Sequence, residues 1–153
     1  MSHSTIEHEI HIDASPEVVF DVVSSPEHLA HWFPEEAQLD ALAPGSRGVL
    51  TFRNDDGTHV APITVVDARP HSLFSFRWSQ DEGTEPTETN ALLVRFELAP
   101  AGSGTLLRMT ESNFDGRGLD DARVLADYED HSQGWSQIMP RLAPYAESLV
   151  ARS

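Results

Sequence analysis

The chain has 153 residues and no cysteine, so disulfides, thiol catalysis and cysteine-bound metals are excluded. Its formal net charge of −15 argues against nucleic-acid binding and against docking on an anionic membrane, because both need a basic face. The acids are scattered along the chain, which fits solubility better than a site for a basic partner or a cationic ligand. The length suits one core, and we expect residues 1–153 to form a single domain.

The N-terminal stretch, residues 1–9, is polar and lacks the apolar centre of a signal peptide. No apolar run elsewhere approaches the length of a membrane span. Together with the missing cysteines, these features predict a cytoplasmic protein.

A strand and two short helices are predicted first. Residues 5–12 alternate between apolar and polar side chains, which is typical of a strand with one solvated face. Ser15-Pro16-Glu17 and Ser25-Pro26-Glu27 then repeat one helix-start signature. Serine caps the helix, proline takes its first position, and glutamate meets its positive end. We expect helices over about 16–23 and 26–32.

Six further strands are predicted after Pro34, over residues 37–42, 48–53, 59–68, 73–79, 90–98 and 105–112. A hairpin turn is expected at 54–57, and residues 80–87 form an acidic loop. Pro62 inside the third of these strands predicts a sheet edge or a bulge, because proline cannot donate to a ladder. Short connections between consecutive strands imply an antiparallel meander.

The C-terminal stretch, residues 119–150, has the apolar spacing of one long helix, with steps of three and four. Asp120 and Asp121 suit its N-cap and first turn. Pro140 and Pro144 each remove a backbone donor, so two helices that break near Pro140 are the alternative. We favour one kinked helix, because the stripe keeps its phase across both prolines. The predicted fold is α+β, a curved antiparallel sheet that wraps this helix.

These elements and several local motifs resemble the helix-grip superfamily, also called START-like or SRPBCC. The closer resemblance is to the family of activator of heat-shock-protein ATPase homologues. The matching residues are Ile10 with 13–20, residues 26–33, Pro44-Gly45 with Gly48 and Phe52, residues 73–78, residues 104–107, and Gly134-Trp135 with Leu142. The similarity spans nearly the whole chain, and Pro140 and Pro144 depart from the family pattern.

The resemblance implies a β-α-α-β(6)-α helix-grip fold with a cavity between the sheet and the C-terminal helix. Members of the superfamily bind lipids, hormones, polyketides or other apolar molecules there, and a few are enzymes. For this chain it implies a cavity lined by Trp32, Phe52, Phe76, Trp78, Phe96, Met109, Glu111, Trp135 and Met139. The alternative is that the aromatic and sulfur-containing side chains simply fill the core.

Glu111 is the one acid that strand alternation puts on the inward face of a late strand. In a cavity it would orient a polar group of a ligand, or act as acid or base in a cyclase- or hydrolase-like enzyme. The alternatives are a strand-end side chain that faces solvent, or an ion pair with Arg108 or Arg117.

The sequence carries no nucleophile elbow and no phosphate-binding loop. His28 and His31 share a helix face, but no third ligand completes a set, so we predict no metal and no cofactor. We interpret the chain as a non-catalytic binding domain for an apolar or aromatic small molecule. The alternatives are the Glu111 enzyme and a chaperone-regulating module that binds a chaperone partner. A homodimer through sheet edges or helix ends is also open.

Overall fold

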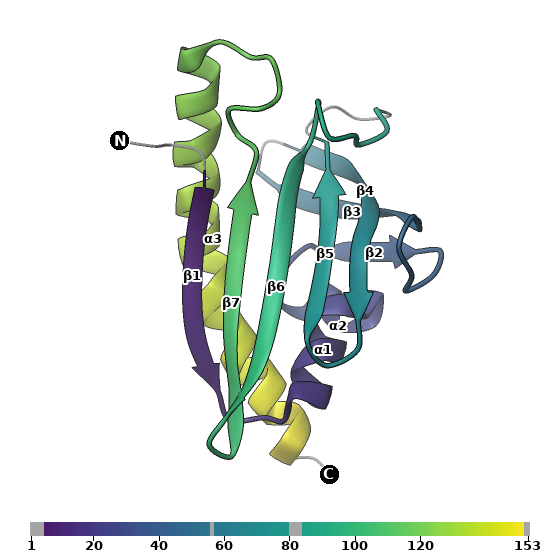
Figure 1. Ribbon diagram of the computed structural model, residues 1–153, viewed down its shortest axis with the longest axis vertical. Coiled ribbons are helices and arrows are strands. Elements are labelled where there is room, and N and C mark those ends of the chain that lie inside the picture. Colours follow the sequence, from purple (N-terminus) through teal and green to yellow (C-terminus); the bar gives the residue numbers. More distant parts are fainter. Residues whose placement is uncertain (1–4, 56, 80–83, 152–153) are drawn as a thin grey trace.

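A seven-stranded antiparallel sheet curves around one long helix (Figure 1). The computed structural model describes residues 5–55, 57–79 and 84–151. The elements in chain order are β1 (Thr5–Ile12), α1 (Pro16–Ser24), α2 (Pro26–Trp32), β2 (Glu36–Leu39), β3 (Arg47–Asn54), β4 (Gly57–Arg69), β5 (Leu73–Trp78), β6 (Leu92–Ala101), β7 (Gly104–Ser112) and α3 (Asp121–Ala151). This order confirms the predicted fold class, and the bounds differ from the predicted ones by a few residues.

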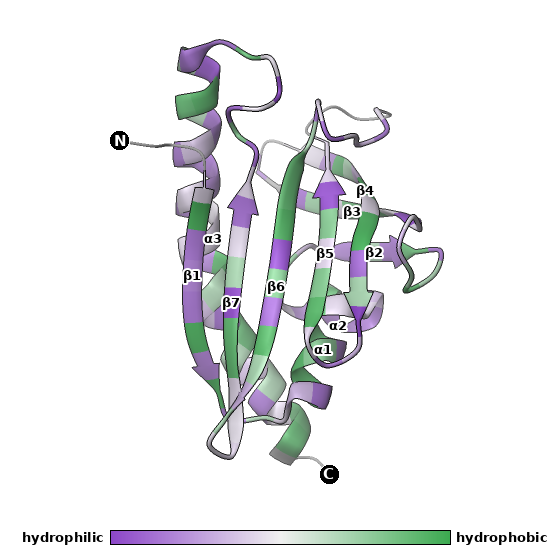
Figure 2. Ribbon diagram, viewed as in Figure 1, coloured by the Kyte–Doolittle hydropathy of each residue, from purple (hydrophilic) through white to green (hydrophobic). Residues whose placement is uncertain are grey.

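The strands lie in the order β1-β7-β6-β5-β4-β3-β2. Strands β2 to β7 form the predicted meander, and β1 pairs with the free side of β7. The register puts Glu111 of β7 between Ile6 of β1 and Val94 of β6, whose side chains are both buried. Apolar and polar residues alternate along these strands, as Figure 2 shows, so that one face turns to the helices.

Pro62 does not mark an edge or a bulge, so that prediction is wrong. Strand β4 lies inside the sheet, Pro62 pairs in register with Val49, and the irregularity falls between Val65 and Asp67. The carbonyl of Pro62 accepts from the amide of Ser79, one residue beyond the end of β5. The N–H and C=O of one strand residue point toward the same neighbouring strand. The position at which Pro62 lacks an N–H therefore faces Ser79, where the β4–β5 ladder has already ended.

The two helix-start signatures differ in their caps. The Oγ of Ser15 accepts from the amide of Val18 at 3.3 Å, as predicted for an N-cap. Ser25 occupies the N-cap position of α2, but its side chain makes no capping hydrogen bond, so that part of the prediction is wrong. Ser25 also ends α1, with its amide donating to the carbonyl of Asp21. One residue therefore joins the two helices without a linker.

The C-terminal stretch forms one helix of 31 residues, so the single-helix prediction is confirmed and the two-helix alternative is wrong. Asp120 caps it, since its Oδ1 accepts from the amide of Arg123 at 2.8 Å. Pro140 and Pro144 both lie inside the helix on its exposed side, where water can reach the carbonyls that lack a partner. The helix runs beside β1 and then bends toward α1 and α2 (Figure 1).

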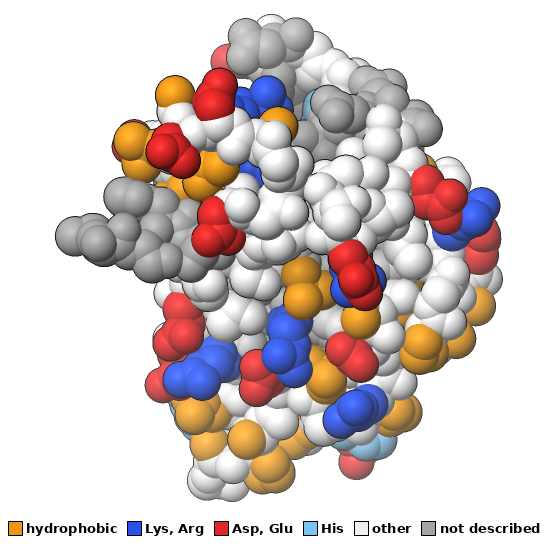
Figure 3. Space-filling view, turned by 45° about the horizontal axis from the view of Figure 1, so that its top comes forward, with side chains coloured by type: hydrophobic (Ala, Val, Ile, Leu, Met, Phe, Trp, Pro, Cys, Tyr) orange, Lys and Arg blue, Asp and Glu red, His pale blue; other side chains and the backbone are white. Residues whose placement is uncertain are grey.

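The outer face of the sheet carries charged side chains of both signs, which are interspersed in Figure 3. Arg108 lies near Glu7 and Glu9, and Arg77 lies near Glu88. Of the acidic loop predicted at 80–87, residues 80–83 lie outside the described residues, as does Asp56 of the predicted turn. Within the described residues, no helix combines the length and apolar composition needed to cross a membrane.

Candidate functional site

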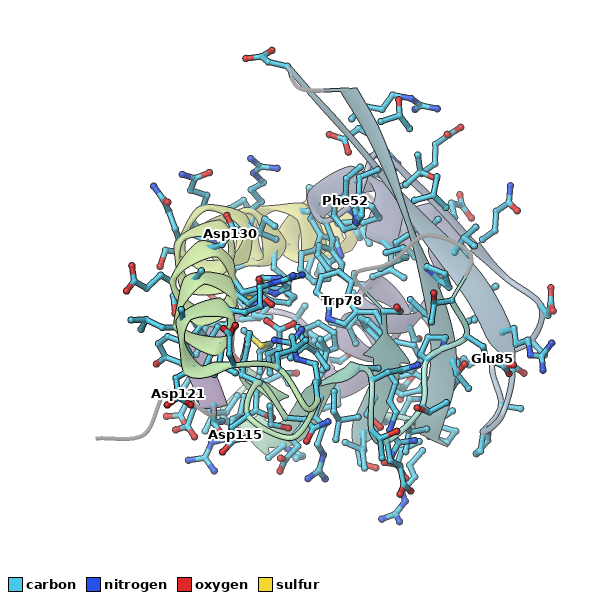
Figure 4. The ribbon with its side chains drawn as sticks, turned by 90° about the horizontal axis from the view of Figure 1, so that it is seen from above. Phe52, Trp78, Glu85, Asp115, Asp121 and Asp130 are labelled. Carbon is cyan, nitrogen blue, oxygen red and sulfur yellow. The ribbon has the colours of Figure 1, made fainter. Side chains whose placement is uncertain are left out.

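A cavity of about 330 Å³ lies between the middle of α3 and the inner face of the sheet. It receives side chains from α3, from β3, β4 and β5, and from the residue after α2. Figure 4 shows Phe52 and Trp78 between α3 and the sheet, with Asp130 on α3. The lining residues are Phe33, Phe52, His59, Ala61, Trp78, Asp130, His131, Gly134, Trp135 and Ile138.

Small residues on both sides leave this space open. Gly134 presents only backbone on the helix side, and Ala61 presents a methyl group on β4. A Cβ atom added to Gly134 would meet no other atom within 4 Å. No side chain from either residue therefore fills the gap between the helix and the sheet here. Farther along α3 the side chains are buried against the core, at Met139, Leu142 and Ala146.

The carboxylate of Glu111 lies behind the cavity wall and is fully buried. Its Oε2 accepts from Trp78 Nε1 at 2.8 Å, and its Oε1 accepts from Trp135 Nε1 at 2.8 Å. His131 Nδ1 lies 2.9 Å from Oε1 and 3.0 Å from Oε2. All these partners can donate, which suits an ionised carboxylate that only accepts. One acid on β7 thus holds three side chains of the wall, two of them from α3 and one from β5.

His131 is the basic partner of this buried acid. Burial acts to lower the pKa of His131, but the hydrogen bond to Glu111 and the charges of Glu111, Asp130 and Asp127 outweigh burial, so the pKa is raised. The side chain is 10% exposed, against 0% for Glu111. A protonated imidazole and a carboxylate in contact at this depth form an ion pair that largely cancels its own charge.

Four aromatic rings of the wall pack against one another. The ring centroid of Phe33 lies 5.0 Å from Trp135, 5.5 Å from Phe52 and 5.6 Å from Trp78. The rings of Phe52 and Trp78 are 5.9 Å apart. These spacings are typical of tilted and edge-to-face aromatic contacts, which favour defined ring orientations. The wall is therefore a fixed aromatic surface, held from behind by Glu111.

The predicted site residues fall into three places. Phe52, Trp78 and Trp135 line the cavity, and Glu111 lies directly behind it. The remaining predicted residues are buried in the core and do not line the cavity: Trp32, Phe76, Phe96, Met109 and Met139. Trp32 uses its indole N–H to bind the carbonyl of Val22 at 2.9 Å. Ligand contact by these nine residues remains a prediction.

Sequence reasoning did not single out Phe33, His131 or Gly134 as cavity residues. A signal for His131 was present, because it precedes Trp135 by four residues and side chains four apart share a helix face. The inward facing of Trp135 therefore implied the same for His131. Nothing in the sequence marked Gly134 as the residue that leaves the space, because that depends on what lies opposite.

The histidines of α2 contact an aromatic residue. His28 Nδ1 lies 2.7 Å from the hydroxyl of Tyr145, and the ring of His31 stacks on Tyr145 at 4.8 Å. In the part of the chain that the structure describes, no group of three or more histidine and acidic side chains is arranged to hold a metal. These histidines instead join α2 to the end of α3.

Residues 13–147 match the family described as Activator of Hsp90 ATPase homolog 1-like protein. The chain belongs to this family. No curated protein matches this Activator of Hsp90 ATPase homolog 1-like chain. Its fold is that of solved structures with low sequence identity, so the predicted helix-grip resemblance is confirmed.

The protein NE0264 of Nitrosomonas europaea is 16% identical, with a TM-score of 0.78 over 99% of either chain. The protein MLL2253 of Mesorhizobium loti is 23% identical, with a TM-score of 0.74 over 94% of this chain and 97% of that one. The Aha1 dimer of Colwellia psychrerythraea is 21% identical, with a TM-score of 0.66 over 91% of this chain and 92% of that one. At these identities the similarity establishes the fold. A homodimer and a chaperone partner remain predictions for this family member.

Proposed function

We propose that this chain binds an apolar or aromatic small molecule in the cavity between the sheet and α3, without converting it. The observation that carries the proposal is the buried Glu111 carboxylate, which fixes Trp78, His131 and Trp135 around an open space. A wall that is arranged before the ligand arrives loses little side-chain freedom on binding. Plain core packing does not require such an arrangement beside a void.

The size of the cavity supports a small ligand. Its volume of about 330 Å³ lies at the lower end of the range for small-molecule sites, which is about 300–1,000 Å³. A dry cavity of about 150 Å³ holds one benzene molecule. The present cavity would therefore hold a ligand of about two rings, or a short branched chain.

The hydrogen bonds of Glu111 favour binding over acid–base catalysis. Both carboxylate oxygens already accept from wall residues, and the side chain has no exposed surface. A general acid or base must reach the ligand atom whose proton moves, directly or through one water molecule. Glu111 is thus a positioning residue in this proposal, and the enzyme alternative would need another group.

The test is to fill the cavity from the helix. Gly134→Leu adds a side chain where the structure leaves room, and Gln133→Leu adds the same side chain at an exposed neighbouring position. Ligands recovered from the purified protein would be identified by native mass spectrometry, and their affinity measured by tryptophan fluorescence. We expect Gly134→Leu to abolish binding and Gln133→Leu to leave it unchanged. Equal binding by both variants would show that the ligand occupies another place.

A further inference from the structure

The polar atoms of the wall tryptophans are turned away from the cavity. Both indole N–H groups donate to the buried carboxylate of Glu111, at 2.8 Å from Trp78 and 2.8 Å from Trp135. What these two residues present to the cavity is therefore ring carbon. The same holds for Phe33 and Phe52, which have no polar atom in the side chain. A ligand meets aromatic faces and edges, and aromatic faces carry partial negative charge.

The ionisable groups at the cavity are the carboxylates of Glu111 and Asp130 and the imidazoles of His59 and His131, which carry a negative balance whenever the two histidines are not both protonated. His131 is paired with Glu111, so the positive charge that it carries when protonated is offset from directly behind the wall. Asp130 adds a second carboxylate at the exposed side of the cavity. Within residues 5–55, 57–79 and 84–151, no ion pair involves Asp130, while the neighbouring Asp127 is paired with Arg117 and Arg123. None of the described residues that line the cavity is an arginine.

The charge of the whole chain acts in the same direction. The sequence has no lysine, and it contains 10 arginines and 25 acidic residues. The resulting field draws cations toward the molecule and repels anions, most strongly at low ionic strength. A carboxylate-bearing ligand would have to approach Asp130 against this field. An organic cation would approach with it and would find aromatic faces on arrival.

We infer that the ligand is an organic cation, an amine or quaternary ammonium compound with a compact aromatic or branched apolar body. This inference rests on the proposed binding function and adds the charge of the ligand. The apolar body lies against Phe33, Phe52, Trp78 and Trp135, and the cationic group lies near Asp130.

Three probes of nearly equal size test the sign of the charge. Benzyltrimethylammonium is the cation, neopentylbenzene replaces its nitrogen by carbon, and phenylmethanesulfonate is the anion. Dissociation constants would be measured by tryptophan fluorescence at low and at moderate salt. We expect the cation to bind about 3–10-fold more tightly than the neutral compound at low salt, and the anion to bind most weakly.

Two neighbouring acids provide matched variants. Asp130 lines the cavity, whereas Glu129 is also exposed on α3 and does not line it. Asp130→Asn should weaken binding of the cation about 3-fold and leave the dissociation constant of the neutral compound unchanged. Glu129→Gln should change the dissociation constant of each compound by less than about 1.5-fold. Gly134→Leu should block all probes that enter the cavity.

The outcomes separate the two proposals. If the neutral compound binds as tightly as the cation, or if Asp130→Asn behaves like Glu129→Gln, the cation inference is overturned. The proposed function stands in that case, provided that Gly134→Leu blocks the neutral compound. If none of the three probes binds the wild-type protein, or if Gly134→Leu blocks none, both proposals are overturned.

Discussion

The long helix meets the sheet in two different ways along its length. From Met139 to Ala146, which we term the filled half, buried side chains occupy the space between α3 and the strands. From Asp130 to Ile138, the open half, the same face of the helix borders a cavity of about 330 Å³. The difference arises from side-chain volume, because larger residues in place of Gly134 and Ala61 would extend into the space between the helix and the sheet. A helix-grip fold can therefore combine a filled core and an open cavity along one helix.

The largest expected effect is at the acid behind the open half. Glu111→Ala leaves two indole N–H groups and a buried imidazole without their acceptor, which should cost about 3–5 kcal/mol of unfolding free energy. Glu7→Ala removes an exposed acid from the neighbouring strand and should cost less than about 1 kcal/mol. Urea denaturation of both variants measures the difference. Similar losses would mean that Glu111 does not organise the wall.

Truncating one residue from each half compares the two directly. Leu142 is fully buried, and Leu142→Ala should cost about 2–5 kcal/mol because it opens a new void. Ile138 already borders open space, so Ile138→Ala should cost only about 1 kcal/mol. The same denaturation measurement applies, and equal losses would contradict the division into filled and open halves.

A gain of stability is expected at the glycine of the open half. Gly134→Ala should raise the unfolding free energy by about 0.5–1 kcal/mol, because alanine favours a helix and its methyl group meets nothing. Gly118 offers a contrast, since its φ of +74° is unfavourable for alanine. Gly118→Ala should therefore lower stability. A loss at Gly134 would show that the space opposite is already occupied.

The smallest effect is a pH dependence that belongs to the open half. The pKa of His131 is raised in the folded chain above its ordinary value of 6.5, mainly because Glu111 opposes the effect of burial. The ion pair should stabilise the fold fully below pH 6.5 and lose this contribution as the pH rises through the folded pKa. His131→Gln should remove that slope, measured as unfolding free energy against pH. An unchanged slope would assign the dependence to other groups.

Periodicity was sufficient to predict much of the fold. The three- and four-residue steps of the C-terminal stretch predicted one helix through Pro140 and Pro144, and alternation in β7 placed Glu111 inward. These signals are local, and the structure confirms both. Pro62 was misjudged because the tolerance for proline depends on where the neighbouring strand ends. That is a property of the ladder, which the residues around Pro62 do not encode.

The candidate site was harder to predict from the sequence than the fold, because a cavity is a volume that no side chain fills. Inward facing could be predicted for Trp32 and Trp78 alike, but only Trp78 borders the open space. The distinction depends on Gly134 and Ala61, which come from different elements. The donors of Glu111 likewise come from β5 and α3, so their convergence required the tertiary structure.

The buried carboxylate also limits how such a site can change during evolution. One carboxylate accepts from Trp78, His131 and Trp135. Replacing any of them removes a hydrogen-bond donor from the buried Glu111 and lowers the stability of the protein before a new ligand can be selected. Phe33, Phe52, Gly134 and Ile138 make no hydrogen bond to Glu111 through their side chains, so a substitution there leaves the hydrogen bonds of the carboxylate intact. Descendants of this chain would therefore diversify on one side of the cavity, while the side held by Glu111 is inherited as a unit.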